Sequence, residues 1–491
     1  MNSLTDSSIP ALVRAISCAK QLKHVNLSSN GIGLSGVTEL CKIIGTLHSL
    51  DLSSTSDAAS ANNIDGSTCA VLSRALCRPS SLTSLNLSGN PIGLGAAGTK
   101  AIELLAVMLT KYNTSLDALS LCNAELGTRG GATIMAALAH NRSVRHIALA
   151  GNDIGPDIGK AVEVVLRVNP NLCGLNLSNN PLGEALPRFS DALAASSSLV
   201  VLNLENVRAD DEGAVEMANV LVSNTSLTHI NLSRNGISPR GGQILAQALY
   251  NNNVVSTIDL SGNPLGDAGA IEIAKVLARS VTIVSMDLSS CKISDEGACY
   301  IFSAIASSTA TGLRRLRLAD NFIGATSSST ILDAVNRNRS LVSLDMSGNQ
   351  LDHVRLSKIK SFCQRNLSIL REVEPRRLRA VIQRLRGQQL KLRKAEALLQ
   401  TYRATISDTQ ARIDEVEQEK ARFLRSQSER RNEIREQIQR EQDLIAEANV
   451  RHLIFTAFTS LFILIYLFIL FIYFIRFIYF TRFIYLFDLF I

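Results

Sequence analysis

A short pattern that recurs along most of the chain restricts the possible folds more than any other feature of the sequence. It is an apolar, polar, apolar triplet whose last residue is followed three positions later by Asn, as in VNLSSN, LNLSGN and IDLSGN. The last apolar residue of the triplet recurs at Leu27, Leu52, Leu87, Leu121, Leu149, Leu177, Leu204, Leu232, Leu260, Leu288, Leu318 and Met346. From Leu121 onward these positions are 27 to 30 residues apart. Such a period predicts about twelve similar units that stack side by side.

Each unit has two halves with different hydrophobic periods. In the first half apolar and polar residues alternate, as at Leu85, Asn86 and Leu87, which predicts a short strand with its leucines turned inward. The second half has the spacing of one helix face, as in Ala270, Ile273, Ala274 and Leu277. Helices are about 10 Å across whereas strands lie about 4.8 Å apart, so the stack must curve. The sequence therefore predicts an α/β solenoid, a horseshoe with a concave parallel sheet and convex helices.

The Asn that follows most strands is expected to bind the backbone groups that a turn leaves exposed. In a stack, these side chains should form an internal hydrogen-bonded ladder. The expected members are Asn30, Asn90, Asn152, Asn180, Asn235, Asn263, Asn321 and Asn349. The second unit has Thr55 at this position and an insertion, STSDAASANNIDG, and the third has extra residues near 111–114. Both insertions are expected to be surface loops, either tolerated insertions or partner contacts.

These features resemble those of leucine-rich-repeat proteins of the ribonuclease-inhibitor-like subfamily. The resemblance rests on LxLxxN, a further apolar residue two places on, and a helix start rich in Gly and Ala. It covers roughly residues 8–370 and implies a solenoid over residues 1–370. That subfamily binds many unrelated partners, so the resemblance implies macromolecular binding without naming the partner.

Motifs for catalysis, metal or cofactor are not apparent. Gly93–Gly98 matches GxGxxG between a strand and a helix, but Gly and Ala fill equivalent turns elsewhere, as at Gly266–Ala270. The nine Cys are scattered without Cys-x-x-Cys, and the seven His are dispersed, so no metal site is expected. The scattered thiols and a polar N-terminus without a secretory leader favour the cytoplasm. The Asn-x-Ser/Thr sequences of the chain are for that reason not interpreted as glycosylation sites. We expect a protein that is not an enzyme and carries no cofactor.

The charge of +7 belongs mostly to the C-terminal part of the chain. Residues 371–452 contain 19 Lys and Arg against 14 Asp and Glu, and residues 1–370 are close to neutral. A near-neutral solenoid does not favour a polyanionic ligand, so no nucleic acid is expected. The predicted concave positions are mostly Ser, Asn and Ala, and charge gathers near the C-terminal end of the sheet. The expected partner-binding residues are therefore Asp259, Asp287, Arg315, Arg317 and Asp345, with an ordinary solvated surface as the alternative.

Residues 371–450 are predicted to form a coiled coil. Heptad positions run from Leu378 to Ala448, with a better apolar seam in the first half than in the second. A helix of about 75 residues would be about 110 Å long, and its exposed stripe favours pairing. We expect homo-oligomers through residues 378–448, and docking with a different chain's helix stays open.

The C-terminal residues 451–491 are strongly apolar. Residues 453–475 contain no charge and are long enough to cross a bilayer. This segment predicts a transmembrane tail anchor that holds the solenoid in the cytosol. The alternative is translated repetitive DNA, because the tail repeats every six residues as FIYFIR, FIYFTR and FIYLFD.

The predicted function is a protein–protein interaction scaffold, cytoplasmic or membrane-tethered, that binds an unidentified protein through the solenoid. A second hypothesis is a GTPase-activating regulator, because the repeats are also similar to those of the Ran GTPase activator. That family follows its repeats with an acidic segment, whereas the segment here is basic. A third hypothesis is a cytoskeletal or ciliary structural component, since long coiled coils joined to such repeats suit filament assemblies.

Overall fold

The computed structural model describes residues 4–371 apart from residues 20, 55–60 and 308–311, together with a few positions between 383 and 444. The chain divides into two compact units, Met1–Pro375 and Arg376–Ile491, and the first holds the solenoid. The predicted coiled coil lies outside the described residues, apart from residue 371 and those few positions. The predicted hydrophobic tail 451–491 lies outside them entirely. None of the helices in the described part is both long and apolar enough to cross a membrane.

Twelve short parallel strands form one sheet in which each strand pairs with its neighbours in sequence. Their bounds are β1 His24–Asn26, β2 Ser49–Asp51, β3 Ser84–Asn86, β4 Ala118–Ser120, β5 His146–Ala148, β6 Gly174–Asn176, β7 Val201–Asn203, β8 His229–Asn231, β9 Thr257–Asp259, β10 Ser285–Asp287, β11 Arg315–Arg317 and β12 Ser343–Asp345. The register is uniform, so the same position of every unit lies in one row. The parallel sheet predicted from the repeat is confirmed.

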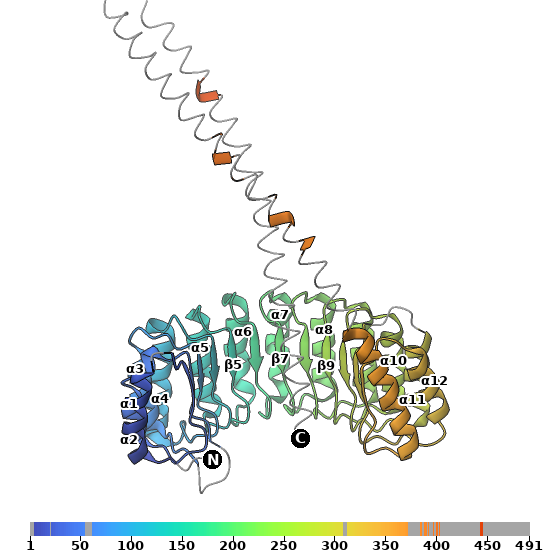
Figure 1. The fold of residues 1–491 in the computed structure, drawn as a ribbon, viewed down its shortest axis with the longest axis horizontal. Coiled ribbons are helices and arrows are strands. Elements are labelled where there is room, and N and C mark those ends of the chain that lie inside the picture. Colours follow the sequence, from blue (N-terminus) through green and yellow to red (C-terminus); the bar gives the residue numbers. More distant parts are fainter. Residues whose placement is uncertain are drawn as a thin grey trace, which may run out of the picture. The chain divides into compact units, whose positions relative to one another are not determined.

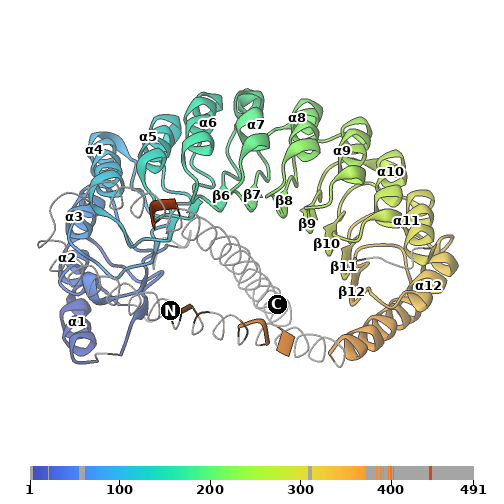
Figure 2. The same ribbon diagram turned by 90° about the horizontal axis from the view of Figure 1, so that it is seen from above.

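Helices alternate with the strands and lie along the outside of the arc, as the view in Figure 2 shows. The α-helices are α1 Ile9–Cys18, α2 Leu34–Leu40, α3 Gly66–Leu76, α4 Gly95–Val107, α5 Gly127–His140, α6 Gly159–Val168, α7 Leu186–Ala195, α8 Asp210–Ser223, α9 Pro239–Asn251, α10 Gly266–Arg279, α11 Asp295–Ser307 and α12 Ser328–Arg337. Residues 353–371 are helical as well. Short 3-10 turns are η1 Asp6–Ser8, η2 Ile44–Thr46, η4 Pro156–Ile158 and η5 Gly183–Ala185. Strands inside and helices outside give the solenoid its curvature (Figure 2), and Figure 1 shows the same units side by side.

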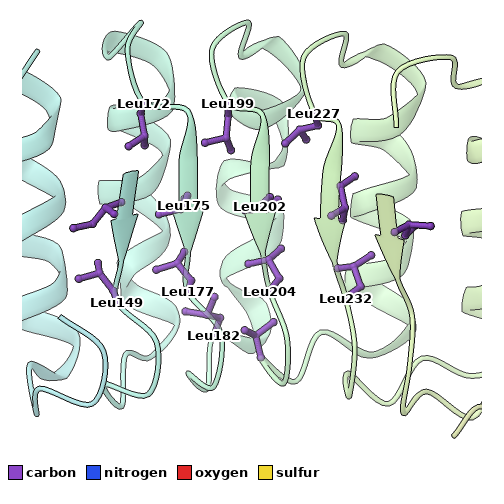
Figure 3. Close-up of a cluster of buried hydrophobic side chains, with 14 of the residues drawn as sticks. Leu149, Leu172, Leu175, Leu177, Leu182, Leu199, Leu202, Leu204, Leu227 and Leu232 are labelled. Atoms are coloured by element: carbon purple, nitrogen blue, oxygen red, sulfur yellow. The ribbon is translucent and has the colours of Figure 1, made fainter. Parts of the chain in front are cut away.

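The core is a set of stacked leucine rows between the sheet and the helices. The middle residue of each strand from β1 to β11 is buried and its two neighbours are more exposed, as the alternation predicts, except that Gly174 of β6 is buried as well. Leu175, Leu202 and Ile230 lie in register on adjacent strands, and Figure 3 shows the two leucines among the stacked side chains. Full burial of each such side chain contributes about 1.5–3 kcal/mol. The rows therefore join neighbouring units over the whole sheet.

The predicted asparagine ladder is present inside the turn that follows most strands, whereas Ala124 and Val207 hold its position after β4 and β7. Asn180 shows the pattern: its Nδ2 donates to the carbonyls of Leu149 and Leu177 at 3.0 and 2.8 Å, and its Oδ1 accepts from Asn152 N at 2.9 Å and Ile154 N at 3.0 Å. Each amide group thus binds its own unit and the preceding one. The fully buried side chain satisfies groups that would otherwise be unpaired.

The ladder continues through the second unit, which the sequence suggested would interrupt it. Asn62, at the end of the insertion, accepts from Asn30 N and Ile32 N at 3.2 and 3.0 Å and donates to Leu27 O at 2.9 Å. Asn62 therefore takes the ladder position, and Thr55 itself lies outside the described residues. In the tenth unit the Cys291 thiol donates to Leu260 O at 3.3 Å in place of an amide.

A second asparagine ladder runs along the other end of the strands, where the helices end. Asn141 Nδ2 donates to Leu109 O at 2.8 Å, and its Oδ1 accepts from Val144 N at 2.7 Å. The residues that donate to the preceding unit in this way are Asn141, Asn169, Asn224, Asn252, Asn338 and Asn366. Several of them belong to Asn-x-Ser/Thr sequences. Their role here is buried hydrogen bonding between units.

The extra residues of the third unit do not form a loop. Met108–Tyr112 continues α4 as one π-helical turn, η3, in which Met108 and Leu109 are fully buried. The expectation of a loop near 111–114 is therefore wrong for residues 111–112, which are helical, although both are exposed as expected of a surface segment. A wider helical turn takes up the additional length while the apolar side chains still face the core.

Candidate functional site

The five predicted partner-binding residues lie close together on the concave face of strands β9 to β12. Asp259, Asp287, Arg317 and Asp345 end consecutive strands and are paired in register, so they form one row. Arg315 begins β11, two residues before Arg317 on the same face. Neighbouring members of the row are about 4.8 Å apart along the sheet. We call these five residues, together with Glu205 and Arg234 described below, the charged patch.

Each aspartate of the charged patch also caps the turn that follows its strand. Asp259 Oδ1 accepts from Ser261 N at 2.9 Å, and Asp287 Oδ1 accepts from Ser289 N at 2.9 Å. Asp345 binds Ser347 N in the same way at 3.1 Å. Asn231 on β8 makes the same contact to Ser233 N at 2.9 Å. The capping role thus needs only one side-chain oxygen, and an amide can supply it.

The carboxylates of the charged patch repel one another. Burial raises the pKa of Asp259 above its ordinary value, and the nearby carboxylates of Asp287 and Glu205 raise this pKa further, while Ser261 opposes them. Arg317 Nη1 lies 3.5 Å from Asp287 Oδ2, which offsets part of this repulsion. Half of the Arg317 side chain stays exposed, so the ion pair is accessible from the concave side. Attraction in an accessible pair of this kind is modest.

Two charged residues of this surface were not predicted from the sequence. Glu205 and Arg234 lie just beyond β7 and β8, where Arg234 Nη1 approaches Glu205 Oε1 to 3.7 Å. Because they follow the strand, strand alternation does not assign them to a face. The signal that identifies them is their offset from the apolar marker, one residue after Leu204 and two after Leu232. His229 begins β8, and burial, followed by the charge of Arg315, lowers its pKa to about 4.

The GxGxxG segment has a packing role in the structure. A Cβ at Gly98 would lie 2.7 Å from the carbonyl oxygen of Ile92, and one at Gly93 would collide with the backbone of Glu125. Gly93 allows this turn to approach the following unit closely, and Gly98 allows α4 to pack closely on its own turn. In the part of the chain that the structure describes, no group of three or more His, Cys, Asp or Glu side chains is placed to hold a metal ion.

Comparison with protein families and curated proteins agrees with the repeated architecture. A family model described as Leucine Rich repeat matches residues 20–41, 78–97, 140–162, 223–246, 251–274, 279–301 and 337–353. The chain is similar to NACHT, LRR and PYD domains-containing protein 5 of Bos taurus, with 27% identity over 216 residues, which are 43% of this chain and 19% of that protein. It is also similar to NACHT, LRR and PYD domains-containing protein 13 of Homo sapiens, with 31% identity over 146 residues, covering 30% of this chain and 14% of that protein. The chain thus spans less than a fifth of the length of these relatives.

Among solved structures, an internalin from Listeria monocytogenes aligns with a TM-score of 0.41 at 15% sequence identity, covering 72% of this chain and 92% of that one. The leucine-rich-repeat-containing protein LegL7 from Legionella pneumophila aligns with a TM-score of 0.39 at 19% identity, covering 61% and 93%. The recurring units of the sequence, the sheet built from them and the matched segments make this chain a member of the leucine-rich-repeat proteins.

Proposed function

We propose that this protein is a non-catalytic interaction scaffold that binds another protein through the charged patch. The observation that carries the proposal is the row of Asp259, Asp287, Arg317 and Asp345 in register on a curved sheet. Hydrogen bonds to the following turns fix the aspartates before any partner arrives. A surface fixed in this way loses little side-chain entropy on binding. Its mixed charge favours a partner with complementary charges and orients the partner during encounter.

The parts of the chain outside the described residues enter the proposal as tethers. Residues 378–448 pair chains as a coiled coil, and residues 453–475 anchor the assembly to a membrane with the solenoid in the cytosol. The curvature and the 28-residue units also support placement in the ribonuclease-inhibitor-like subfamily. Imaging a tagged chain with and without residues 453–491 tests the anchor, and an unchanged distribution would refute it.

The test of the charged patch uses the double variant Asp259→Asn and Asp287→Asn. Asn keeps the oxygen that caps the turn, as Asn231 does in the same row, so the fold should be retained. The full chain is used for affinity capture with quantitative mass spectrometry. We expect recovery of the specific partner to fall about tenfold, because two charges on the partner lose their complement.

Asp51→Asn is the matched control. Asp51 ends β2 and caps Ser53 N at 2.9 Å, so it has the same structural role at the other end of the sheet. This variant should capture the partner as well as the unmodified chain does. Equal recovery by the double variant and the unmodified chain would show that the charged patch is not the binding surface.

A further inference from the structure

The edge of the solenoid at which the α-helices end carries an excess of positive charge. This helix-end edge consists of the last two residues of each helix from α1 to α12 and the linker to the next strand. Among the described residues it holds eleven Lys and Arg against two acidic residues, Glu39 and Asp117. Figure 3 shows Leu172, Leu199 and Leu227, one from each of three successive linkers, in one row along this edge. A solenoid that is close to neutral as a whole thus has a cationic edge.

The helix ends themselves explain part of this charge. The carbonyl groups at the end of a helix favour nearby cations. Arg142 shows the effect, because its Nη1 donates to Ala139 O at 3.3 Å and to Val168 O at 3.0 Å. These two hydrogen bonds also join the end of α5 to the end of α6. A cationic edge by itself therefore indicates no ligand.

Apolar side chains project from the same edge, and the helix ends do not require them. Tyr112 is 54% exposed and Val168 is 46% exposed. Tyr112 ends η3 and Val168 ends α6, whereas the last residues of α8 and α9 are Ser223 and Asn251. The fold thus accepts a polar residue at this position. Neither the helix ends nor the packing of the units explains an exposed aromatic or aliphatic side chain there.

Hydrogen bonds hold the ends of η3, α5 and α6 beside one another. Asn141 Nδ2 donates to Leu109 O at 2.8 Å, and Asn169 Nδ2 donates to Leu138 O at 2.7 Å. The three ends are therefore fixed in a row, with the cations and the apolar side chains interleaved. The exposed residues at these ends, which we call the edge patch, are Lys111, Tyr112, Arg142, Arg167 and Val168.

The edge patch keeps a positive charge when its ion pair is included. Glu163 Oε1 accepts from Arg167 Nε at 3.0 Å, and Glu163 Oε2 accepts from Lys160 Nζ at 2.9 Å. Two cations share this one carboxylate, so the group stays positive, and Lys111 and Arg142 add to it. All these side chains lie at the surface, where their attraction to a ligand depends on salt.

We propose that the edge patch binds a membrane surface that contains anionic lipid. Lys111, Arg142 and Arg167 lie beside the lipid phosphate and carboxylate groups, and Tyr112 and Val168 enter the headgroup layer between them. Tyr suits this depth because its ring is apolar and its hydroxyl group is polar. A nucleic acid would engage the cations but would leave Val168 without a role. The proposed contact belongs to the solenoid and needs anionic headgroups, so it is separate from the predicted tail anchor.

The test uses fluorescence of the full chain, because the chain contains no Trp and Tyr112→Trp therefore adds a single reporter. The reporter is titrated with vesicles of phosphatidylcholine alone or mixed with phosphatidylserine, each with brominated acyl chains that quench Trp on contact. We expect a blue shift and quenching only with phosphatidylserine. Leu94→Trp is the matched control, since Leu94 is 65% exposed at the opposite end of α4, and it should show neither change.

Charge reversal in the reporter chain separates the edge patch from other parts of the molecule. Lys111→Glu should raise the lipid concentration for half-maximal quenching at least about fivefold, because one attraction to the lipid becomes a repulsion. Lys100→Glu makes the same change of charge at an exposed position in the middle of α4 and should leave the titration unchanged. Far-UV circular dichroism checks that the variants fold, which exposed positions should permit.

The proposal is overturned if the chain does not bind the vesicles, or if it binds them while Tyr112→Trp stays unquenched. Equal quenching of Leu94→Trp, or equal effects of Lys111→Glu and Lys100→Glu, would overturn it as well. A blue shift with duplex DNA but not with vesicles would assign the edge patch to nucleic acid instead. Lys111 lies just before β4, far along the sheet from β9 to β12, so Lys111→Glu should leave capture through the charged patch intact. The two proposals can therefore fail independently.

Discussion

At the scale of single residues, buried amide side chains decide how firmly one unit is held to the next. Asn180 makes hydrogen bonds to Asn152 and Ile154 and to the carbonyls of Leu149 and Leu177. A buried amide that loses its partner costs about 1–3 kcal/mol, more than the bond itself contributes. The ladder is therefore more sensitive to deletion of a side chain than the number of its bonds suggests.

The variant Asn180→Ala should lower the free energy of unfolding by about 2–4 kcal/mol, because it leaves two buried N–H groups and several carbonyls without partners. Urea denaturation followed by circular dichroism measures the change. Asn253→Ala is the control, since Asn253 is exposed, and it should alter stability by no more than about 0.5 kcal/mol. Similar stability of the two variants would contradict the role assigned to the ladder.

Which residues join the ladders could be predicted only where the spacing is regular. The eight members that follow the LxLxxN pattern could be predicted because each lies three residues after an apolar marker. Asn62 lies ten residues after Leu52, so no fixed offset identifies it. The second ladder follows the helices, and Ser196 and Ser280 replace Asn at some of its positions, which hides the pattern. Asn141 and Asn224, both buried, also match the Asn-x-Ser/Thr pattern, which does not indicate a role between units.

At the scale of elements, alternation fixed the strands and the side of the sheet on which the charged row lies. Asp259, Asp287, Arg317 and Asp345 all immediately precede an apolar marker, so their common face follows from the sequence. Helix ends were less predictable, because the local sequence does not show whether the extra residues of a longer unit form a loop or extend the helix. The π turn η3 is the example, since its buried Met108 and Leu109 fit an ordinary helical pattern as well. Packing against the adjoining helices selects the wider turn.

The start of α4 depends on a glycine that permits close backbone contact. In Gly98→Ala the added methyl group would meet the backbone of Gly93 and Ile92, so the turn must move away from its neighbours. We expect the free energy of unfolding to fall by about 1–3 kcal/mol, the usual cost of overpacking. Thermal and urea denaturation of Gly98→Ala and of Ala96→Ser, an exposed position in the same helix, provide the comparison. Equal stability of both variants would show that the close approach is not required.

At the scale of the whole molecule, the solenoid is a chain of contacts between neighbours. Every strand from β2 to β11 has a partner on both sides, whereas β1 and β12 each have one within the described sheet. All three residues of β12 are only partly buried, unlike the centres of the interior strands. Stability in such an array is a sum of unit and interface contributions, so it should decline toward the ends.

Hydrogen exchange followed by mass spectrometry should show this decline directly. We expect amides in β6, β7 and β8 to exchange at least about tenfold more slowly than those in β1 and β12, because local opening of an end unit breaks one interface instead of two. A uniform exchange rate along the sheet would indicate that the solenoid opens as one cooperative body.

The two asparagine ladders also determine which insertions and deletions of sequence the solenoid can accommodate. Each rung connects only adjacent units, through carbonyls that recur at the same place in every unit. Removing or duplicating one whole unit brings equivalent hydrogen-bonding surfaces together again, whereas a cut of half a unit sets a strand against a helix. Genetic changes in whole multiples of the unit are thus structurally neutral at the joint, and the binding arc can be lengthened or shortened without redesign of its interior.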